Sequence, residues 1–581
     1  MDLFAVLSLI GGLCLFLFGM NLMGQALERR AGSALSTLLG KLTTRKALGF
    51  LTGLLVTAVI QSSSATTVMV VGFVNSGLLS LRQAINVIMG ANVGTTVTAW
   101  LLSLSGISGE SLLVQLLKPT SFTPILALIG IILYMFSKKD KSKDTGTILL
   151  GFAVLMFGMD TMSGAVSGLK DVPAFGQMFL AFENPILGVL AGAVLTAIIQ
   201  SSSASVGILQ ALATTGQVSY GAVIPIIMGQ NIGTCITAIL SCIGTTKNAR
   251  RAAIVHLMFN VIGTIIWLAV YYVADLLFQP VLLQEAATMS GIAIAHSAFN
   301  IGCTIVLLPM SQLLEKLAYR LVPDAKTPET VSELDERLFA TPAVALDRSR
   351  AVATEMGVCA VGALKNALTC LKQYSPELAE QIREAEEKTD HYEDILGSYL
   401  VRLSNLQTGQ DASSEAAMLL KVIGDFERIS DHSVNILEAK EELQAKAFSF
   451  TPAALAELDV LTAAVEEILD VSLAAFLSND AASVESVEPL EQVIDRLKEQ
   501  LRSRHIQRLQ QGECTIEVGF VWSDLLTNLE RTADHCSNIA GGIIDLKNHD
   551  MNMHQHLRDI QTTSEGFREK LAFYTEKYAL S

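Results

Sequence analysis

Seven long apolar stretches constrain this chain more than any other feature of its sequence. Each comes close to the roughly 20 residues that a helix needs to cross the ~30 Å hydrocarbon core of a membrane. They lie at about 3–26, 83–104, 120–137, 146–168, 221–243, 252–274 and 288–310. Because a helix satisfies its backbone groups within one segment even in lipid, we expect an all-α, multi-pass membrane domain.

The charge of the chain divides near residue 320. Residues 1–320 carry a net charge of +6 and residues 321–581 a net charge of −21, which gives −15 for the whole chain. The eight cysteines show no CxxC spacing, which favours buried thiols over disulfides or zinc ligands. We therefore expect a membrane domain over 1–320, a linker over 321–343 and an acidic, water-soluble helical domain over 344–581.

An internal repeat with an offset of 139 residues runs through the membrane part. Three blocks match in one ungapped register: GLCLFLFGMNLM with GFAVLMFGMDTM, QSSSA with QSSSA, and IMGANVGTTVTA with IMGQNIGTCITA. The first members begin at 12, 61 and 88, and the second members at 151, 200 and 227. This register predicts a tandem duplication, with repeats at about 3–137 and 146–274 and an extra span at 288–310.

The two repeats are predicted to be inverted relative to each other. If the stretches around the QSSS motifs, at about 47–81 and 185–219, are re-entrant hairpins, each repeat has three crossings and the second copy turns over. With the N-terminus outside, fifteen Lys and Arg residues fall on the cytoplasmic side and only Lys118 and Lys170 on the outer side. This positive-inside pattern predicts a plasma membrane protein, in the inner membrane of a bacterium, whose C-terminal domain is cytoplasmic.

The two QSSS motifs are predicted to form an anion site at the middle of the membrane. A serine run between two short helices can cap the second helix and direct its free N–H groups and positive dipole end to the midplane. Two opposed tips would surround an anion with hydroxyl, N–H and amide groups. The alternative is that the serines only allow close helix packing. The expected ligands are Gln61, Ser62, Ser63, Ser64, Gln200, Ser201, Ser202 and Ser203.

A second pair of polar blocks, GANVGTT at 90–96 and GQNIGTC at 229–235, is predicted to bind Na⁺. Their glycines permit local unwinding, which frees carbonyl oxygens, and neutral oxygens suit Na⁺ better than Ca²⁺. Asp160, which replaces Asn21 at the same repeat position, is an ionisable residue within a span and joins the candidates. The alternatives are a glycine-based helix crossing and, for Asp160, a structural hydrogen bond. The candidate sodium ligands are Asn92, Thr95, Asn231, Thr234, Asp160 and Thr66.

Together these motifs resemble the type II sodium/phosphate cotransporter family. Paired QSSS motifs in inverted repeats, each followed by an asparagine, glycine and threonine block, are similar to that family over about residues 1–315. The resemblance implies Na⁺-driven uptake of inorganic phosphate, with both hairpins supplying phosphate and sodium ligands. It does not carry over the ion stoichiometry, because Ala65, Thr66 and Thr67 follow the first motif where vertebrate members have a threonine-rich run.

The acidic part of the chain carries a second duplication, with an offset of 103 residues. DFERISDHSVNI, from 425, matches NLERTADHCSNI, from 528. Apolar residues at helical spacing predict a short tail helix and longer helices at about 344–374, 376–407, 413–447, 452–477, 483–510 and 514–547. Four ExxxD pairs each place two carboxylates on one helix face. These pairs are Glu386 and Asp390, Glu427 and Asp431, Glu491 and Asp495, and Glu530 and Asp534.

Such pairs in a duplicated three-helix bundle resemble the PhoU-like domain. The resemblance implies that the ExxxD pairs can bind a transition metal or another divalent cation, and that the domain regulates phosphate uptake. We expect it to restrain the inner gate of the transporter when cytoplasmic phosphate or metal is plentiful. The alternative is that these carboxylates form a solvated acidic face.

No enzyme motif is present in the sequence, which has no GxxxxGK[ST], no GxSxG and no His/Cys metal spacing. The expected partners are inorganic phosphate, Na⁺ and the lipid bilayer, with a cytoplasmic regulatory partner or a second copy of the chain as further candidates, and no nucleic acid. Two other functions stay open. One is a membrane-bound anion sensor that signals through the acidic domain, and the other is a Na⁺-coupled transporter of sulfate or a small carboxylate.

Overall fold

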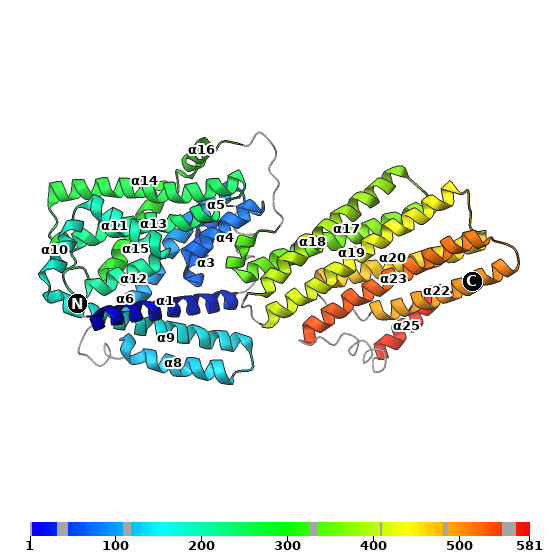
Figure 1. Ribbon diagram of the computed structural model, residues 1–581, viewed down its shortest axis with the longest axis horizontal. Coiled ribbons are helices and arrows are strands. Elements are labelled where there is room, and N and C mark those ends of the chain that lie inside the picture. Colours follow the sequence, from blue (N-terminus) through cyan, green and yellow to red (C-terminus); the bar gives the residue numbers. More distant parts are fainter. Residues whose placement is uncertain are drawn as a thin grey trace. The chain divides into compact units, whose positions relative to one another are not determined.

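The computed structural model describes residues 3–31, 45–107, 118–324, 334–406, 410–479, 486–548 and 565–580 (Figure 1). The chain divides into two compact units, Met1–Ala345 and Leu346–Ser581. Within the described residues both units are built of helices, and β-structure is limited to one isolated bridge between Ser219 and Ala286. The prediction of an all-α protein is confirmed.

Seven segments in the described part of the first unit are long and apolar enough to cross a membrane. They coincide with the seven predicted stretches, so the first unit has the composition of a multi-pass membrane domain. They are α1 (Leu3–Ala31), α5 with α6 (Leu81–Gly94 and Thr96–Ser103), α8 (Pro119–Phe136), α9 (Asp140–Val166), α13 (Tyr220–Ser241), α14 (Lys247–Phe278) and α15 (Met289–Leu307).

Each QSSS motif joins two short helices. The first motif lies between α3 (Lys46–Ile60) and α4 (Ser63–Asn75), and the second between α11 (Pro185–Ile199) and α12 (Ser202–Ala213). At 1.5 Å per residue these helices are about 18–23 Å long, which is too short for one of them to cross the hydrocarbon core. The break at each motif is as expected, while re-entry from one membrane face stays a prediction.

The first helices of the two repeats, α1 and α9, pack against each other in antiparallel fashion. A Cβ atom on Gly12 would lie 3.0 Å from the carbonyl oxygen of Gly158, and one on Gly19 would lie 2.7 Å from that of Gly151. Gly12 corresponds to Gly151 in the 139-residue register, and Gly19 to Gly158. The contact of Gly12 with Gly158 is therefore equivalent to the contact of Gly19 with Gly151. Such reciprocal contacts indicate a twofold axis and agree with inverted repeats.

Glycines also allow each hairpin to touch the span that follows it. A Cβ atom on Gly53 of α3 would lie 1.9 Å from the carbonyl oxygen of Val87 in α5. At the equivalent place, a Cβ atom on Gly192 of α11 would lie 2.1 Å from the carbonyl oxygen of Ile226 in α13. Backbone thus packs directly on backbone at both crossings, and any side chain here would separate the helices.

The expected unwinding of the two glycine blocks is largely wrong. The helix α13 continues through the whole of 229–235, and in the first repeat the helix is interrupted only at Thr95, between α5 and α6. Gly90 and Gly229 instead serve helix crossings, because a Cβ atom on either would lie 1.9 Å from a carbonyl oxygen of α3 or α11. Helical hydrogen bonds are retained because unpaired backbone groups are costly in a buried span.

The second unit is a helical bundle whose predicted helices are confirmed to within a few residues. The two copies of its 103-residue repeat contact each other reciprocally. His432 Nδ1 lies 2.8 Å from Asn528 Oδ1, and His535 Nδ1 lies 2.9 Å from Asp425 Oδ1. The helices from the unit boundary onward are α17 (Pro342–Lys372), α18 (Pro376–Ser404), α19 (Gln410–Ala445), α20 (Pro452–Ser478), α22 (Val487–Gln510), α23 (Ile516–Asn548) and α25 (Glu565–Lys577).

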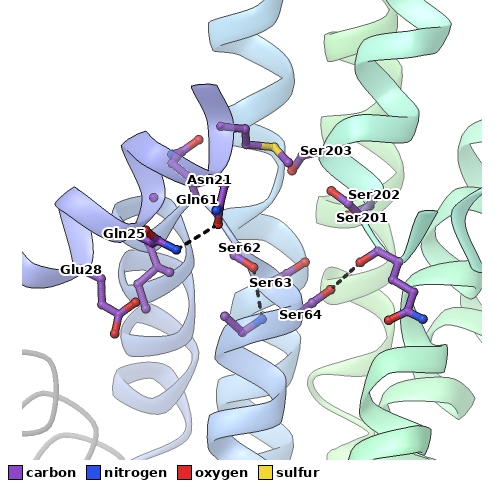
Figure 2. A pocket seen from close by; sticks show the side chains of 15 residues that line it. Asn21, Gln25, Glu28, Gln61, Ser62, Ser63, Ser64, Ser201, Ser202 and Ser203 are labelled. Carbon is purple, nitrogen blue, oxygen red and sulfur yellow. Dashed lines mark hydrogen bonds between the residues drawn. The ribbon is translucent and has the colours of Figure 1, made fainter. Parts of the chain in front are cut away.

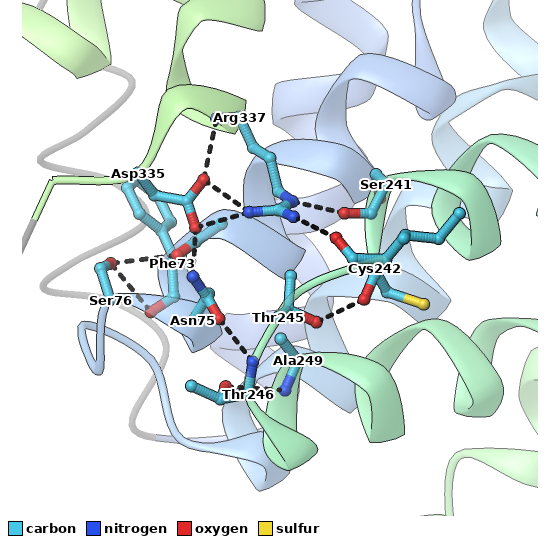
Figure 3. A network of polar contacts seen from close by, with 12 residues as sticks. Phe73, Asn75, Ser76, Ser241, Cys242, Thr245, Thr246, Ala249, Asp335 and Arg337 are labelled. Carbon is cyan, nitrogen blue, oxygen red and sulfur yellow. Dashed lines mark hydrogen bonds and ion pairs between the residues drawn. The ribbon is translucent and has the colours of Figure 1, made fainter. Parts of the chain in front are cut away.

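Residues 334–341, here called the docking segment, belong to the first unit although they fall in the predicted linker. Asp335 is 2% exposed and accepts a hydrogen bond from Asn75 Nδ2 at 2.6 Å (Figure 3). Arg337 donates to the carbonyl oxygens of Ser241 and Ile243 at the end of α13. A cation is favoured there by the helix dipole. This part of the chain is packed structure that leads directly into α17.

Gly53→Ala is expected to destabilise the first unit, because the added methyl group overlaps the backbone of α5. Overpacking of this kind typically costs about 1–3 kcal/mol. The thermal unfolding midpoint of the purified protein in detergent measures the effect. Gly11→Ala is the matched control, since a Cβ atom there meets nothing within 4 Å, and an equal midpoint for both variants would contradict the close crossing.

Candidate substrate-binding site

Both QSSS motifs lie at one cavity in the first unit (Figure 2). Its volume is about 300 Å³. The motifs are separated by 139 residues in the sequence, yet Ser64 Oγ donates a hydrogen bond of 3.5 Å to the carbonyl oxygen of Gln200. All eight predicted anion ligands line the cavity. The full lining is Met20, Asn21, Gly24, Gln25, Glu28, Ile60, Gln61, Ser62, Ser63, Ser64, Ala65, Gln200, Ser201, Ser202 and Ser203.

The two motifs turn the chain by the same backbone device. Gln61 and Gln200 both have φ of 60°, in the left-handed region, and each ends the first helix of its pair. Such a conformation is uncommon for a residue other than glycine. The side chain of Gln61 is held in place, because Thr98 Oγ1 donates to Gln61 Oε1 at 2.9 Å. The glutamines are therefore part of the turn as well as of the cavity wall.

One serine of each motif caps the helix that follows. Ser62 Oγ accepts a hydrogen bond from the backbone N–H of Ala65, and Ser201 Oγ accepts one from that of Ala204, both at 3.2 Å. This is the usual role of an N-cap serine, and its loss typically costs about 1 kcal/mol. The first serine of each run thus has a structural role as a helix cap, which the prediction did not distinguish from the role of a ligand.

Three other serines have hydroxyl groups that are available to a ligand. Ser63, Ser202 and Ser203 lie in the first turns of α4 and α12 and are 5–7% exposed. Within the described part of the chain their side chains have no hydrogen bond. The first N–H groups of a helix lack intrahelical partners, and its positive dipole end attracts anions. Two helix N-termini and three hydroxyls therefore face one cavity, an arrangement that suits an oxyanion.

A polar stripe of α1 forms the third wall, and the sequence analysis did not predict it. Asn21, Gln25 and Glu28 follow one another at helical spacing on one face and line the cavity (Figure 2). Gln25 Nε2 donates to Asn21 Oδ1 at 3.4 Å. The stripe could have been found as three polar residues on one face of an apolar helix. Comparison of the repeats does not reveal the stripe, because the positions equivalent to Gln25 and Glu28 in the second repeat are Gly164 in α9 and Ser167 just after it.

The sodium ligands predicted in the glycine blocks do not line this cavity. Asn92, Thr95, Asn231 and Thr234 are all buried. Three of them are bonded to their own helices: the side chains of Thr95, Asn231 and Thr234 donate to backbone oxygens one turn earlier, at 2.9–3.1 Å. Asn92 Oδ1 lies 3.3 Å from His256 Nε2 of α14. Their sodium-binding role stays a prediction that the arrangement of these side chains does not favour.

The other two sodium candidates lie in different surroundings. Thr66 is fully buried in α4 beside the first motif, and its hydroxyl donates to the backbone oxygen of Ser62 at 3.0 Å. Asp160 is exposed on α9 and does not line the cavity, although its repeat equivalent Asn21 does. The structure therefore brings Thr66 close to the anion ligands and leaves Asp160 apart from them.

In the second unit the four ExxxD pairs form two acidic clusters, one on α18 and α19 and one on α22 and α23. Burial, reinforced by neighbouring carboxylates, raises the pKa of Glu386, Glu427 and Asp534 above their usual range. The same causes raise the pKa of Glu491 to about 8. Pairs that are distant in sequence thus influence each other electrostatically, as a shared cation site requires.

A preformed metal site is not present in the described residues, where no group of three His, Cys, Asp or Glu side chains is placed to hold a metal ion. Basic side chains lie against several of the carboxylates instead. Lys498 Nζ is 2.9 Å from Glu530, and Arg428 is 3.3 Å from Asp431. The predicted metal ligands are therefore neutralised in part by lysine and arginine, and a metal would have to displace these partners.

Comparisons with known proteins agree with this two-part organisation. The model of the Na⁺/Pi-cotransporter family matches residues 15–164 and 176–283, and the model of the PhoU domain matches residues 353–439 and 458–543. The crystal structure of PhoU from Pseudomonas aeruginosa matches 35% of this chain and 97% of its own, at 23% identity and a TM-score of 0.34.

Three relatives show how far the similarity extends. YjbB of Salmonella typhimurium, a protein named provisionally for inorganic phosphate export, is 24% identical over 94% of this chain and 98% of its own length. Human sodium-dependent phosphate transport protein 2B is 34% identical over 18% of this chain and 16% of its own. The uncharacterized protein YqeW of Bacillus subtilis is 31% identical over 53% of this chain and 95% of its own. The chain thus belongs to the Na⁺/Pi-cotransporter family and carries a C-terminal PhoU domain.

Proposed function

We propose that this protein transports inorganic phosphate together with Na⁺ through the cavity between the two QSSS motifs. The observation that carries the proposal is the convergence of two helix N-termini and their free serines, from inverted repeats, on one cavity. Such donors suit a tetrahedral oxyanion, and secondary transporters place their substrates where inverted repeats meet. Membership of the family supports phosphate as the anion and Na⁺ as the coupling ion.

Uptake is the direction that an inward Na⁺ gradient would drive. We infer that the N-terminus is outside and the second unit cytoplasmic, because the basic residues of the membrane half then gather on the inner side. Export is a second candidate, since YjbB, which is similar over 94% of this chain, is named for export. A symporter is reversible, so the gradients decide between the two.

The PhoU domain is proposed to regulate this transport through the docking segment. Asn75 at the end of α4 accepts a hydrogen bond from the N–H of Thr246 at 2.8 Å and donates one to Asp335 (Figure 3). The first hairpin, the turn before α14 and the segment that leads into α17 are thereby joined at one side chain. A conformational change that reaches α17 through the chain can therefore act on the hairpin that carries the substrate serines.

Purified protein in vesicles is expected to accumulate ³²P-phosphate only when a Na⁺ gradient is present. The double variant Ser63→Ala with Ser202→Ala should lower this flux at least about 100-fold, because it loses two free hydroxyl groups of the cavity. Reversing the gradient reports the direction of transport, and excess sulfate reports selectivity. Thr145→Ala with Thr161→Ala is the matched control, since these hydroxyls bond their own helix outside the cavity. A protein that binds phosphate without any flux would be a sensor.

Arg337→Ala is expected to abolish the response of transport to phosphate inside the vesicles while leaving the KM for external phosphate unchanged. The substitution removes the contacts to α13 that fix the docking segment. The measurement is initial uptake at increasing internal phosphate. Arg320→Ala, an exposed arginine before the docking segment, should retain the response, and a normal response in Arg337→Ala would rule out coupling through this contact.

The second unit should lose stability between about pH 5 and pH 8 when metals are chelated. The pKa of Glu491 is about 8 in the folded chain, so in this window the unfolded state loses its proton first and unfolding is favoured as the pH rises. Calorimetry of the full chain measures this transition, and Glu491→Gln should flatten its pH dependence, whereas exposed Glu499→Gln should not. Added Mn²⁺ should raise the midpoint at pH 8 if the cluster binds a divalent cation.

A further inference from the structure

The cavity has the wrong charge for an anion alone. Among the described residues that line it there is no Lys or Arg, and the one charged side chain is the carboxylate of Glu28. Phosphate is also negative at neutral pH, and two like charges that are close together in one cavity repel each other. Hydroxyls and helix dipoles attract phosphate but leave this net negative charge in place. A cation bound in the cavity would offset this negative charge.

The stripe on α1 offers the oxygen atoms that such a cation needs. Asn21, Gln25 and Glu28 supply two amide carbonyls and a carboxylate on one helix face. Oxygen ligands of this kind are those that hard cations prefer. The stripe lies across the cavity from the serines that face the anion (Figure 2). The two kinds of ligand are thus separated within one space, with acceptors on one wall and donors on the other.

Glu28 forms no direct ion pair with its basic neighbour Arg29 in the described structure. Arg29 Nε instead forms an ion pair with Asp144 of α9 at 2.9 Å. Within the described part of the chain Glu28 has no hydrogen bond or ion pair of its own. A carboxylate left without a partner on a cavity wall is costly to keep unless a cation binds there. Because Arg29 is paired with Asp144, the carboxylate of Glu28 is accessible to a cation from solution.

We propose that Asn21, Gln25 and Glu28 form a Na⁺ site beside the phosphate site. The inference rests on the proposed function and adds its sodium ligands. The second repeat has Gly164 and Ser167 in place of Gln25 and Glu28. The site is therefore specific to the first repeat, and it differs from the set in the glycine blocks, whose side chains do not line the cavity.

The test is the Na⁺ dependence of ³²P-phosphate uptake in vesicles that contain the full chain. Glu28→Gln should raise the Na⁺ concentration for half-maximal uptake at least about fivefold, the lower end of typical couplings between sites. Glu28→Asp should recover part of this loss. Glu285→Gln, which removes an exposed carboxylate outside the cavity, should behave as the unmodified protein. Gln25→Leu gives a second variant at an exposed position if Glu28→Gln does not fold.

A binding measurement without transport separates this inference from the proposed function. NaCl, compared with choline chloride and without phosphate, should raise the thermal midpoint of the unmodified protein and not that of Glu28→Gln. If the unmodified protein shows no Na⁺-dependent uptake, the proposed function fails. If it does, and Glu28→Gln keeps the same Na⁺ dependence in both assays, only the Na⁺ site is refuted. A loss of phosphate selectivity over sulfate with unchanged Na⁺ dependence would also refute it.

Discussion

Direct backbone contact between helices at glycine positions holds the two repeats together. At Gly12 and Gly19 of α1 the partner is α9, the equivalent helix of the other repeat, and the contact is reciprocal. Without a hydrophobic driving force between helices in lipid, close van der Waals approach at small residues is what makes such contacts stable. The antiparallel pairing of α1 and α9 agrees with repeats that are inverted relative to each other, and the QSSS motifs of both repeats line one cavity.

The serines of each motif look alike in the sequence but have different roles in the structure. Ser62 and Ser201 cap helices, whereas Ser63 and Ser202 keep free hydroxyls. Both repeats supply the donor wall, with one free serine hydroxyl from the first motif and two from the second. The acceptor wall is not symmetric, because Glu28 has no acidic counterpart in α9. In the proposed site, the carboxylate of Glu28 beside the bound anion would give a physical reason for coupling to a cation, since the cation offsets the negative charge of both groups.

The docking segment is packed against the first unit and differs in this from a free linker. A free linker would transmit little force, because a flexible chain relaxes before its ends move the elements that they join. Here the buried carboxylate of Asp335 and the capping guanidinium of Arg337 fix the segment to α4 and α13. The docking segment leads directly into α17, which begins at Pro342. The proposed regulation by the second unit would act through this segment on α4, the helix that begins at the first QSSS motif.

The sequence by itself determined the helical spans, the two duplications, the family resemblance and the polar QSSS motifs at the helix breaks, because periodicity and repetition are local patterns that do not depend on packing. Tertiary structure alone decided which polar groups share the cavity. The glycine block at 229–235 stayed helical because its glycines serve a crossing with α11. Glu28 joined the cavity because α1 presents that face to the two hairpin tips. Neither outcome follows from local pattern, since each depends on which helix packs against which.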